Sequence, residues 1–205
     1  DAAGFAIAER MTAQIRGLNM ATKNANDGLS MLATVENATN DVTDMLQRIR
    51  ELAVQAANDT NSLEDRTFLQ TEVNSLLQEI NRVATHTIYN NKVVLDGNLS
   101  GDFQVGTEKG QTIGFDIKSI DTHTLALTNG TATTDGYDGT YVIAATDPQA
   151  LSTGTAGAIS ILTATDATNS LEKISDALEQ VAGNRAEYGA LQNRLEYTVS
   201  NLMNV

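Results

Sequence analysis

The side chains that could perform catalysis or hold a metal ion are few and far apart in this sequence. His86 and His123 each stand alone, without a carboxylate or a second histidine at a spacing that would bind a metal. Asp135-Gly-Tyr-Asp138 is similar to the start of a calcium loop, but it lacks the periodic ligands and the closing Glu, so a simple turn is the better interpretation. No glycine-rich phosphate loop, nucleophile elbow or HExxH motif is present. We therefore expect no enzyme, no cofactor and no metal site.

The charge balance and the lack of cysteine narrow the class of protein further. Lys and Arg number 13 against 26 Asp and Glu, so the net charge is −13. Such a charge opposes binding to nucleic acid or to an anionic membrane. No apolar run approaches the roughly 18 residues that a membrane-spanning helix needs. Neither nucleic acid nor a membrane is therefore expected as a partner. Because the sequence has no cysteine, it does not indicate whether the protein works in an oxidising or a reducing compartment.

The elements that must position any functional surface begin with an unusually long helical pattern. Between residues 5 and 56 an apolar or small residue recurs every three or four positions, and no proline interrupts the run. This seam consists of Phe5, Ala8, Met11, Ile15, Leu18, Ala21, Ala25, Leu29, Leu32, Val35, Ala38, Val42, Met45, Ile49, Leu52 and Ala56. Such a repeat is typical of the buried stripe of a coiled coil. It predicts a rod with a thin core drawn out along its helices.

Two further helices are predicted to pack along the first. Ser62 and Asp65 have the spacing of a capping box after a run of turn-forming residues, so a second helix begins there and folds back antiparallel. Its predicted seam is Leu69, Val73, Leu76, Ile80 and Val83. A last helix is predicted from about Ser170 to the end of the sequence, and we expect it beside the first helix.

The segment between the second and last helices has a β pattern. Apolar and polar residues alternate over residues 103–105 and 113–117 around a glycine-bearing turn, which predicts a β-hairpin. Residues 121–168 are rich in Thr, Ala and Gly, and Tyr141-Val-Ile143 and Ile159-Ser-Ile-Leu162 are predicted as short strands.

The expected fold class is therefore mainly α with a β portion. It is an elongated rod of long antiparallel coiled-coil-like helices, two N-terminal and one C-terminal, with a β-hairpin and a small β-rich segment. We expect a discontinuous rod core of residues 1–120 and 159–205. Residues 121–158 form an insertion, a candidate small outer domain.

Six long motifs stand out along these predicted elements. They are residues 1–10 (DAAGFAIAER), 14–19 (QIRGLN), 24–28 (NANDG), 46–55 (LQRIRELAVQ), 103–106 (FQVG) and 184–194 (NRAEYGALQNR). In this order they resemble the bacterial flagellins, the subunits of the flagellar filament. The resemblance covers about residues 1–118 and 159–205, and residues 121–158 occupy the position where flagellins are variable. Gly183, Tyr188 and Leu195 depart from the usual residues, but only in size within a packing helix.

The resemblance implies a structural function, which is self-assembly with other flagellin subunits into a filament for swimming motility. It implies an extracellular location in the bacterial flagellum, reached through the flagellar type III export pathway without a cleaved signal peptide. Flagellar cap and junction proteins and an export chaperone are the further partners implied for a full-length chain. Because Asp1 is not an initiator Met and no helix stop signal precedes Val205, we expect a core fragment without the terminal segments of the inner tube.

Two alternatives remain open at this point. A flagellar hook-associated junction protein would share the terminal helical pattern, although it would normally have a larger middle domain. A surface adhesin would use the outer face of the rod or the Thr-rich segment.

The resemblance also implies recognition by the innate immune receptor Toll-like receptor 5. The candidate residues are Gln47, Arg48, Glu51, Leu52, Gln55 and Glu72. Of these, Arg48, Leu52 and Glu72 match the main contacts of the family. The purely structural alternative is that Leu52 belongs to the core and that Arg48 is a solvated charge paired with Glu51 or Asp44.

Five glycines lie inside the helical patterns, where each costs about 1 kcal/mol relative to Ala. They are Gly4, Gly17, Gly28, Gly183 and Gly189. Close approach of a neighbouring helix would explain this cost, and tolerated surface glycine is the alternative.

Overall fold

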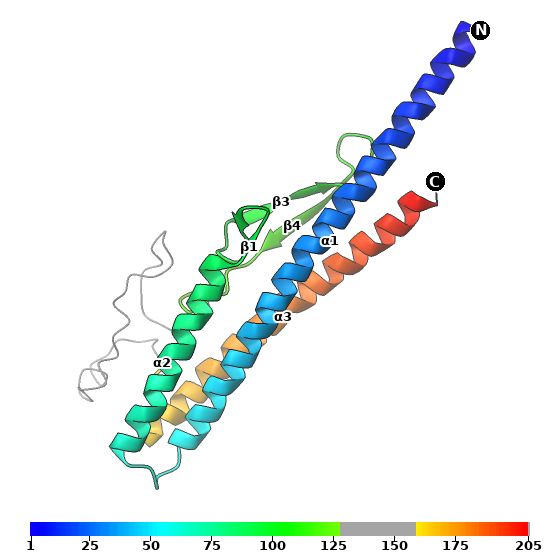
Figure 1. Ribbon diagram of the computed structural model, residues 1–205. Coiled ribbons are helices and arrows are strands. Elements are labelled where there is room, and N and C mark those ends of the chain that lie inside the picture. Colours follow the sequence, from blue (N-terminus) through cyan, green and yellow to red (C-terminus); the bar gives the residue numbers. More distant parts are fainter. Residues whose placement is uncertain (128–158, 205) are drawn as a thin grey trace.

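The computed structural model describes residues 1–127 and 159–204, and within them it contains three helices and two small antiparallel β-hairpins. The helices are α1 (Ala2–Ala56), α2 (Leu63–His86) and α3 (Ala164–Met203). α1 runs along the whole rod, and α2 and α3 lie along it in the opposite direction (Figure 1). This arrangement confirms the predicted fold class.

Side-chain hydrogen bonds hold the turn between α1 and α2. The predicted capping box is present: Ser62 Oγ accepts the N–H of Asp65 at 3.1 Å, and the Asp65 carboxylate accepts the N–H of Ser62 at 2.8 Å. The hydrogen bond from the Ser62 N–H, followed by that from the Ser62 hydroxyl to Asp65 Oδ2 at 2.8 Å, lowers the pKa of the Asp65 carboxyl from its ordinary value. Arg66 donates to Ala56 O at 2.8 Å and to Asn58 O at 3.0 Å. Backbone carbonyls left over at the end of α1 therefore have partners.

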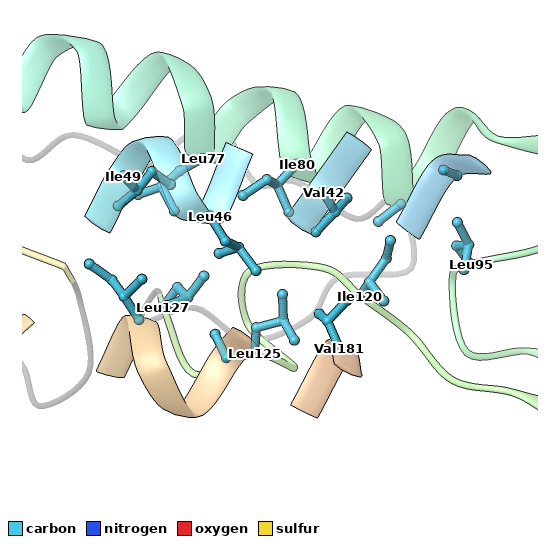
Figure 2. Close-up of a cluster of buried hydrophobic side chains, with 14 of the residues drawn as sticks. Val42, Leu46, Ile49, Leu77, Ile80, Leu95, Ile120, Leu125, Leu127 and Val181 are labelled. Carbon is cyan, nitrogen blue, oxygen red and sulfur yellow. The ribbon is translucent and has the colours of Figure 1, made fainter. Parts of the chain in front are cut away.

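The core is a line of apolar side chains between the helices. Figure 2 shows Val42, Leu46 and Ile49 of α1 facing Leu77 and Ile80 of α2. On the other side lie Ile120, Leu125 and Leu127, all buried, together with Val181 of α3. The first three belong to residues 118–127, which with residues 159–163 are here called the connecting chain. Burial of one such side chain stabilises a fold by about 1.5–3 kcal/mol. The thin core predicted from the sequence is therefore the main source of stability along the rod.

The buried face of α2 is turned slightly from the predicted seam. Val73 and Ile80 are buried as expected, but Leu77 and Ala84 complete the face. The other predicted seam residues are half-buried, namely Leu69, Leu76 and Val83. Because α2 packs both on α1 and on the connecting chain, its apolar stripe is wider than a two-helix seam.

Only the second part of the predicted α1 seam is buried. Buried residues of α1 begin at Ala21, whereas Phe5, Met11 and Ile15 are exposed, Phe5 by 67%. The N-terminal part of α1 extends beyond the end of α3, as Figure 1 shows. Within the described residues, the repeat is therefore a guide to burial only where another element lies alongside.

The predicted β-hairpin is confirmed and lies against α1. It consists of β3 (Leu99–Gln104) and β4 (Thr112–Ile117), which pair antiparallel. The side chain of Asn24 donates to Gln104 O at 3.0 Å and ties the hairpin to α1. The rings of Phe103 and Phe115 stack with centroids 4.4 Å apart.

A smaller hairpin was missed by the sequence analysis. β1 (Ile88–Tyr89) and β2 (Lys92–Val93) are joined by Asn90 and Asn91, whose φ angles are 49° and 62°. Two left-handed residues in a two-residue loop are the geometry of a tight hairpin turn, and Asn tolerates this conformation.

The predicted start of the last helix is wrong. α3 begins at Ala164 rather than near Ser170, because the Thr163 side chain caps it and accepts the N–H of Asp166 at 3.0 Å. Residues 159–162 do not form the predicted strand, because the backbone of this segment bonds to the side chain of Gln70 instead. The predicted strand of residues 141–143 and the loop of residues 135–138 lie outside the described residues.

The connecting chain packs into the rod as far as the described residues extend. Leu125 and Leu127 follow the predicted domain boundary at residue 120 but belong to the core. The division into a rod core and an outer insertion stays a prediction.

Two of the five helical glycines lie where another element comes close. A Cβ at Gly28 would lie 3.0 Å from Phe103 Cζ and 3.1 Å from Leu195 Cδ1, and a Cβ at Gly17 would lie 2.7 Å from Thr107 Cγ2. The hairpin region therefore makes the close approach at both sites, joined by α3 at Gly28. Nothing lies within 4 Å of a Cβ at Gly4, Gly183 or Gly189.

Candidate recognition surface on α1 and α2

Five of the six predicted receptor-contact residues lie exposed on α1 and α2. They are Gln47, Arg48, Glu51 and Gln55 of α1 and Glu72 of α2, here called the α1–α2 strip. The α1 members point outward because Leu46 and Ile49 occupy the core-facing positions of the same turns. α2 runs back along α1 and so brings Glu72 next to Arg48.

Leu52, the sixth predicted residue, lies beneath this strip. It is 1% exposed and belongs to the core, as the purely structural alternative holds. In this conformation Leu52 offers no surface to a partner. Its contribution to the strip is to fix the helix that carries the polar residues.

Arg48 joins the two helices at the centre of the strip. Its Nε donates to Glu72 Oε1 at 2.8 Å, and its Nη1 donates to Glu51 Oε2 at 3.0 Å. The side chains remain 48% exposed for Arg48, 44% for Glu72 and 68% for Glu51. The hydrogen bond with Glu72, followed by that with Glu51, raises the pKa of the Arg48 guanidinium. Exposed pairs contribute little to folding, about 0–1 kcal/mol, so this network orients side chains more than it stabilises the rod.

The pairing with Glu51 agrees with the structural alternative, but the pairing with Glu72 crosses from one helix to the other. Arg48 and Glu72 are far apart in sequence, and only the antiparallel packing of α2 on α1 brings them together. The strip thus presents one guanidinium and two carboxylates, flanked by two amides, on a rigid pair of helices. This set of groups is suited to hydrogen bonding with a protein partner, in which Arg is often the strongest anchor.

The described part of the chain offers little other chemistry. Within residues 1–127 and 159–204, no group of three or more His, Asp or Glu side chains could hold a metal ion. His86 and His123 are both exposed. No helix within the same residues has the length and apolar character needed to cross a membrane.

Sequence analysis missed two amide side chains of α2 that bind the connecting chain. Gln70 is fully buried, and Asn81 Oδ1 accepts both the N–H and the hydroxyl of Thr122, at 2.9 and 3.0 Å. The signal for Gln70 was its spacing, because it precedes the buried Val73 and Leu77 by three and seven residues. A polar residue in phase with an apolar face is a candidate for a buried hydrogen-bonding role.

Comparison with known sequences agrees with these features. Residues 1–100 match the family described as the bacterial flagellin N-terminal helical region. Over 205 residues, 100% of the chain, it is 37% identical to a flagellin of Halalkalibacterium halodurans and spans 65% of that protein. Over 127 residues, 62% of the chain, it is 49% identical to a flagellin of Salmonella paratyphi A and spans 26% of it. The chain therefore covers less than the full length of both relatives.

Solved structures have the same architecture. The crystal structure of Bacillus cereus flagellin matches with a TM-score of 0.65 at 24% identity, over 88% of each chain. FliC from Burkholderia pseudomallei matches with a TM-score of 0.62 at 25% identity, over 82% of this chain and 99% of that one.

A Vibrio parahaemolyticus protein assigned provisionally to the flagellar hook-associated class has the same fold. Its TM-score is 0.71 at 15% identity, over 100% of this chain and 93% of that one, and this similarity concerns the fold alone. Sequence identity along the whole chain, the N-terminal family match and the shared architecture lead to one conclusion: the chain belongs to the flagellin family.

Proposed function

We propose that this chain forms the rod of a structural subunit that assembles with other flagellin subunits into the flagellar filament. The observation that carries the proposal is an apolar stripe on the first part of α1, where Ile7, Met11 and Ile15 recur every four residues and are exposed, with Phe5 exposed beside them. A contiguous apolar surface of this kind marks a site of contact with another surface. Copies of one rod that meet through unlike surfaces build an open helical filament when the rotation between neighbours does not close into a ring.

In this proposal the protein acts outside the cell as part of the bacterial flagellum and serves swimming motility. Its whole product would leave through the flagellar type III export pathway without a cleaved signal peptide. The cap and junction proteins of the flagellum and an export chaperone would be its further partners. Membership of the flagellin family supports a structural rather than a catalytic function.

Filament formation is tested with the complete product of the gene in a bacterium that lacks its own flagellin. We expect helical filaments in the electron microscope and restored swimming. Met11→Asp should prevent or shorten filaments, because it places a charge in the apolar stripe. Ala13→Asp is the matched control, since this exposed residue lies about 200° further round the same helix. Normal filaments formed by the Met11→Asp variant would show that the stripe is not needed for assembly. Absence of filaments from the unmodified protein would reject the proposed function.

A hook-associated junction protein is the second candidate, because the Vibrio parahaemolyticus structure shares the fold along the whole chain. Antibody-gold labelling of intact flagella separates the two functions. Label along the whole filament supports the filament subunit, whereas label confined to the junction with the hook supports the alternative. Adhesion to a surface is compatible with the first outcome and would be measured separately, by binding of filaments to host cells.

We also propose that the α1–α2 strip is recognised by Toll-like receptor 5. The resemblance of residues 46–55 to the flagellin pattern and the accessibility of Arg48, Glu51 and Glu72 support this proposal. Leu52 would act from beneath the strip, as packing support. The first test is the affinity of the receptor ectodomain for the unmodified chain. No binding at micromolar concentration would reject recognition and leave the filament proposal intact.

A further inference from the structure

Leu127 and Ile159 are the last and first described residues on either side of residues 128–158, and they are hydrogen-bonded to each other. The N–H of Ile159 donates to Leu127 O at 3.0 Å, and both residues are fully buried. The same N–H···O bond closes a β-turn when only two residues lie between donor and acceptor. We call residues 122–127 and 159–161 the neck of the rod.

The outgoing side of the neck is held by α2 and by its own turn. Asn81 of α2 binds Thr122, as described above, and the N–H of Leu127 donates to Thr122 O at 2.8 Å. Asp121 accepts the N–H of Thr124 at 2.7 Å. Burial opposes the charge of Asp121, but hydrogen bonds from Ser119 and Thr124 outweigh it and leave the pKa of this carboxyl lowered. The turn therefore keeps a charged acceptor at neutral pH.

The returning side of the neck is held by Gln70. Its Nε2 donates to Ile159 O at 3.3 Å, and its Oε1 accepts the N–H of Ile161 at 2.7 Å. An amide side chain offers one acceptor and two donors, so Gln70 serves residues 159–161 as a neighbouring strand would. The remaining donor position of Gln70 reaches Asn74 Oδ1 at 3.0 Å. Between the two ends of this segment, Ser160 O accepts from Ser170 of α3 at 2.7 Å.

We propose that Gln70 is the clamp that closes the neck, so that the rod reaches its full stability whatever chain joins Leu127 to Ile159. Each of the neck's hydrogen bonds described above joins it to residues of the rod or joins two residues of the neck. If Gln70 is lost, the buried N–H of Ile161 and the carbonyl of Ile159 lose their side-chain partner, and such groups are costly to bury alone. This device would let residues 128–158 change in sequence without disturbing α1 and α2, which carry the α1–α2 strip.

The first arm of the test replaces residues 128–158 by a two-residue Asn-Gly link in the full chain. The Leu127–Ile159 bond then becomes the closing bond of a tight turn that Asn-Gly favours. A short link also costs less closure entropy than a long one. We expect the melting temperature to be equal to that of the parent or higher. A second variant with a four-residue Gly-rich link guards against strain in the shorter one, and a fall with both links would overturn the proposal.

The second arm replaces the clamp. Gln70→Leu keeps the volume but removes both polar groups, so we expect the melting temperature to fall by about 5–10 °C. Exchange of the Ile161 amide hydrogen should become at least about tenfold faster, in the parent and in the linked variant alike. Gln180→Leu, at an exposed position of α3, is the matched control and should change neither quantity. Unchanged exchange at Ile161 in Gln70→Leu would overturn the proposal.

Gln70→Glu separates hydrogen bonding from packing if the Leu variant does not fold. A buried carboxyl has a raised pKa, and in its protonated form it can both donate to Ile159 O and accept from Ile161 N. The loss of melting temperature relative to the parent should therefore be smaller at pH 5 than at pH 8. An equal loss at both pH values would show that Gln70 acts only by filling space and would overturn the clamp.

Discussion

The two parts of α1 have the same sequence pattern and opposite surroundings. Apolar residues recur at the same spacing throughout, yet Phe5, Met11 and Ile15 are exposed while Leu32 and Val42 are fully buried. α2, α3 and the hairpin lie along the second part (Figure 1), and the hairpin region reaches back to Gly17. The repeat therefore shows which helix surface is suited to packing against a partner. Only the second part of that surface is covered by elements of the same chain. We therefore expect the first part to be the one that contacts other molecules.

The largest difference between the two parts of α1 should appear in folding stability when a charge is placed in each part. Val42→Asp puts an unpaired carboxylate at a fully buried position, which costs several kcal/mol, comparable with the roughly 5–15 kcal/mol that stabilises a whole domain. We expect loss of the cooperative thermal transition and of much of the helical circular dichroism. Leu32→Asp should act in the same way.

Met11→Asp is the counterpart in the exposed part. Its effect on the free energy of unfolding should stay within about 0.5 kcal/mol, because the side chain is already in solvent. Similar melting curves for Met11→Asp and Val42→Asp would break the comparison between the two parts.

The second part of α1 also has an outward face, which carries Arg48. A substitution of Arg48 should change receptor binding much more than folding stability. Arg48→Ala removes an exposed donor, so the free energy of unfolding should change by at most about 0.5–1 kcal/mol. A central Arg anchor often contributes about 2 kcal/mol or more to an interface, which corresponds to roughly thirtyfold weaker binding of the Toll-like receptor 5 ectodomain.

Two further variants make the binding experiment specific. Glu72→Ala should weaken binding in the same direction but less, and Arg194→Ala, exposed on α3, is the control. Affinity and thermal melting are measured for each variant. Unchanged affinity for Arg48→Ala, or a loss that only follows a lower melting temperature, would leave the α1–α2 strip as ordinary rod surface.

The smallest expected effect comes from the glycines of α1. Gly4→Ala in the exposed part meets nothing within 4 Å, so it should stabilise the chain by up to about 1 kcal/mol through helix propensity. Gly28→Ala gains the same propensity but brings its Cβ to 3.0 Å from Phe103 and 3.1 Å from Leu195, which offsets it. Denaturant melts should show Gly28→Ala less stable than Gly4→Ala. The reverse order would mean that the hairpin and α3 do not press on α1 in solution.

Local signals predicted much of the fold correctly. The extent of the first helix, the capping box at Ser62 and the β3–β4 hairpin depend on neighbouring residues, and the structure confirms all three. The start of α3 was misplaced although Thr163 and Asp166 carry a local cap signal, because the Thr-rich composition around them favoured a non-helical interpretation.

Features that depend on distant contacts could not be predicted from spacing alone. Periodicity placed Leu52 in the seam, but only packing shows that it is fully covered, and only the return of α2 pairs Arg48 with Glu72. Gln70 has the spacing of a core residue, yet two of its three hydrogen-bond partners, Ile159 and Ile161, lie beyond residue 158. Receptor recognition by the strip remains a prediction that depends on the family resemblance.

The connection between α1 and α2 also has a consequence for the order of folding. Arg66, Asn61 and the capping box tie these helices through contacts close in sequence, whereas the pairing of α1 with α3 joins residues as distant as Glu36 and Gln192. Contacts between distant residues form more slowly because a long loop must close first. We therefore expect the α1–α2 pair to form early, with one apolar side uncovered until α3 packs against it. Pulse-labelled hydrogen exchange would then show protection of the amides of α1 and α2 before those of α3. A newly made chain would pass through an interval in which it is prone to stick to its neighbours, and α3 would end that interval.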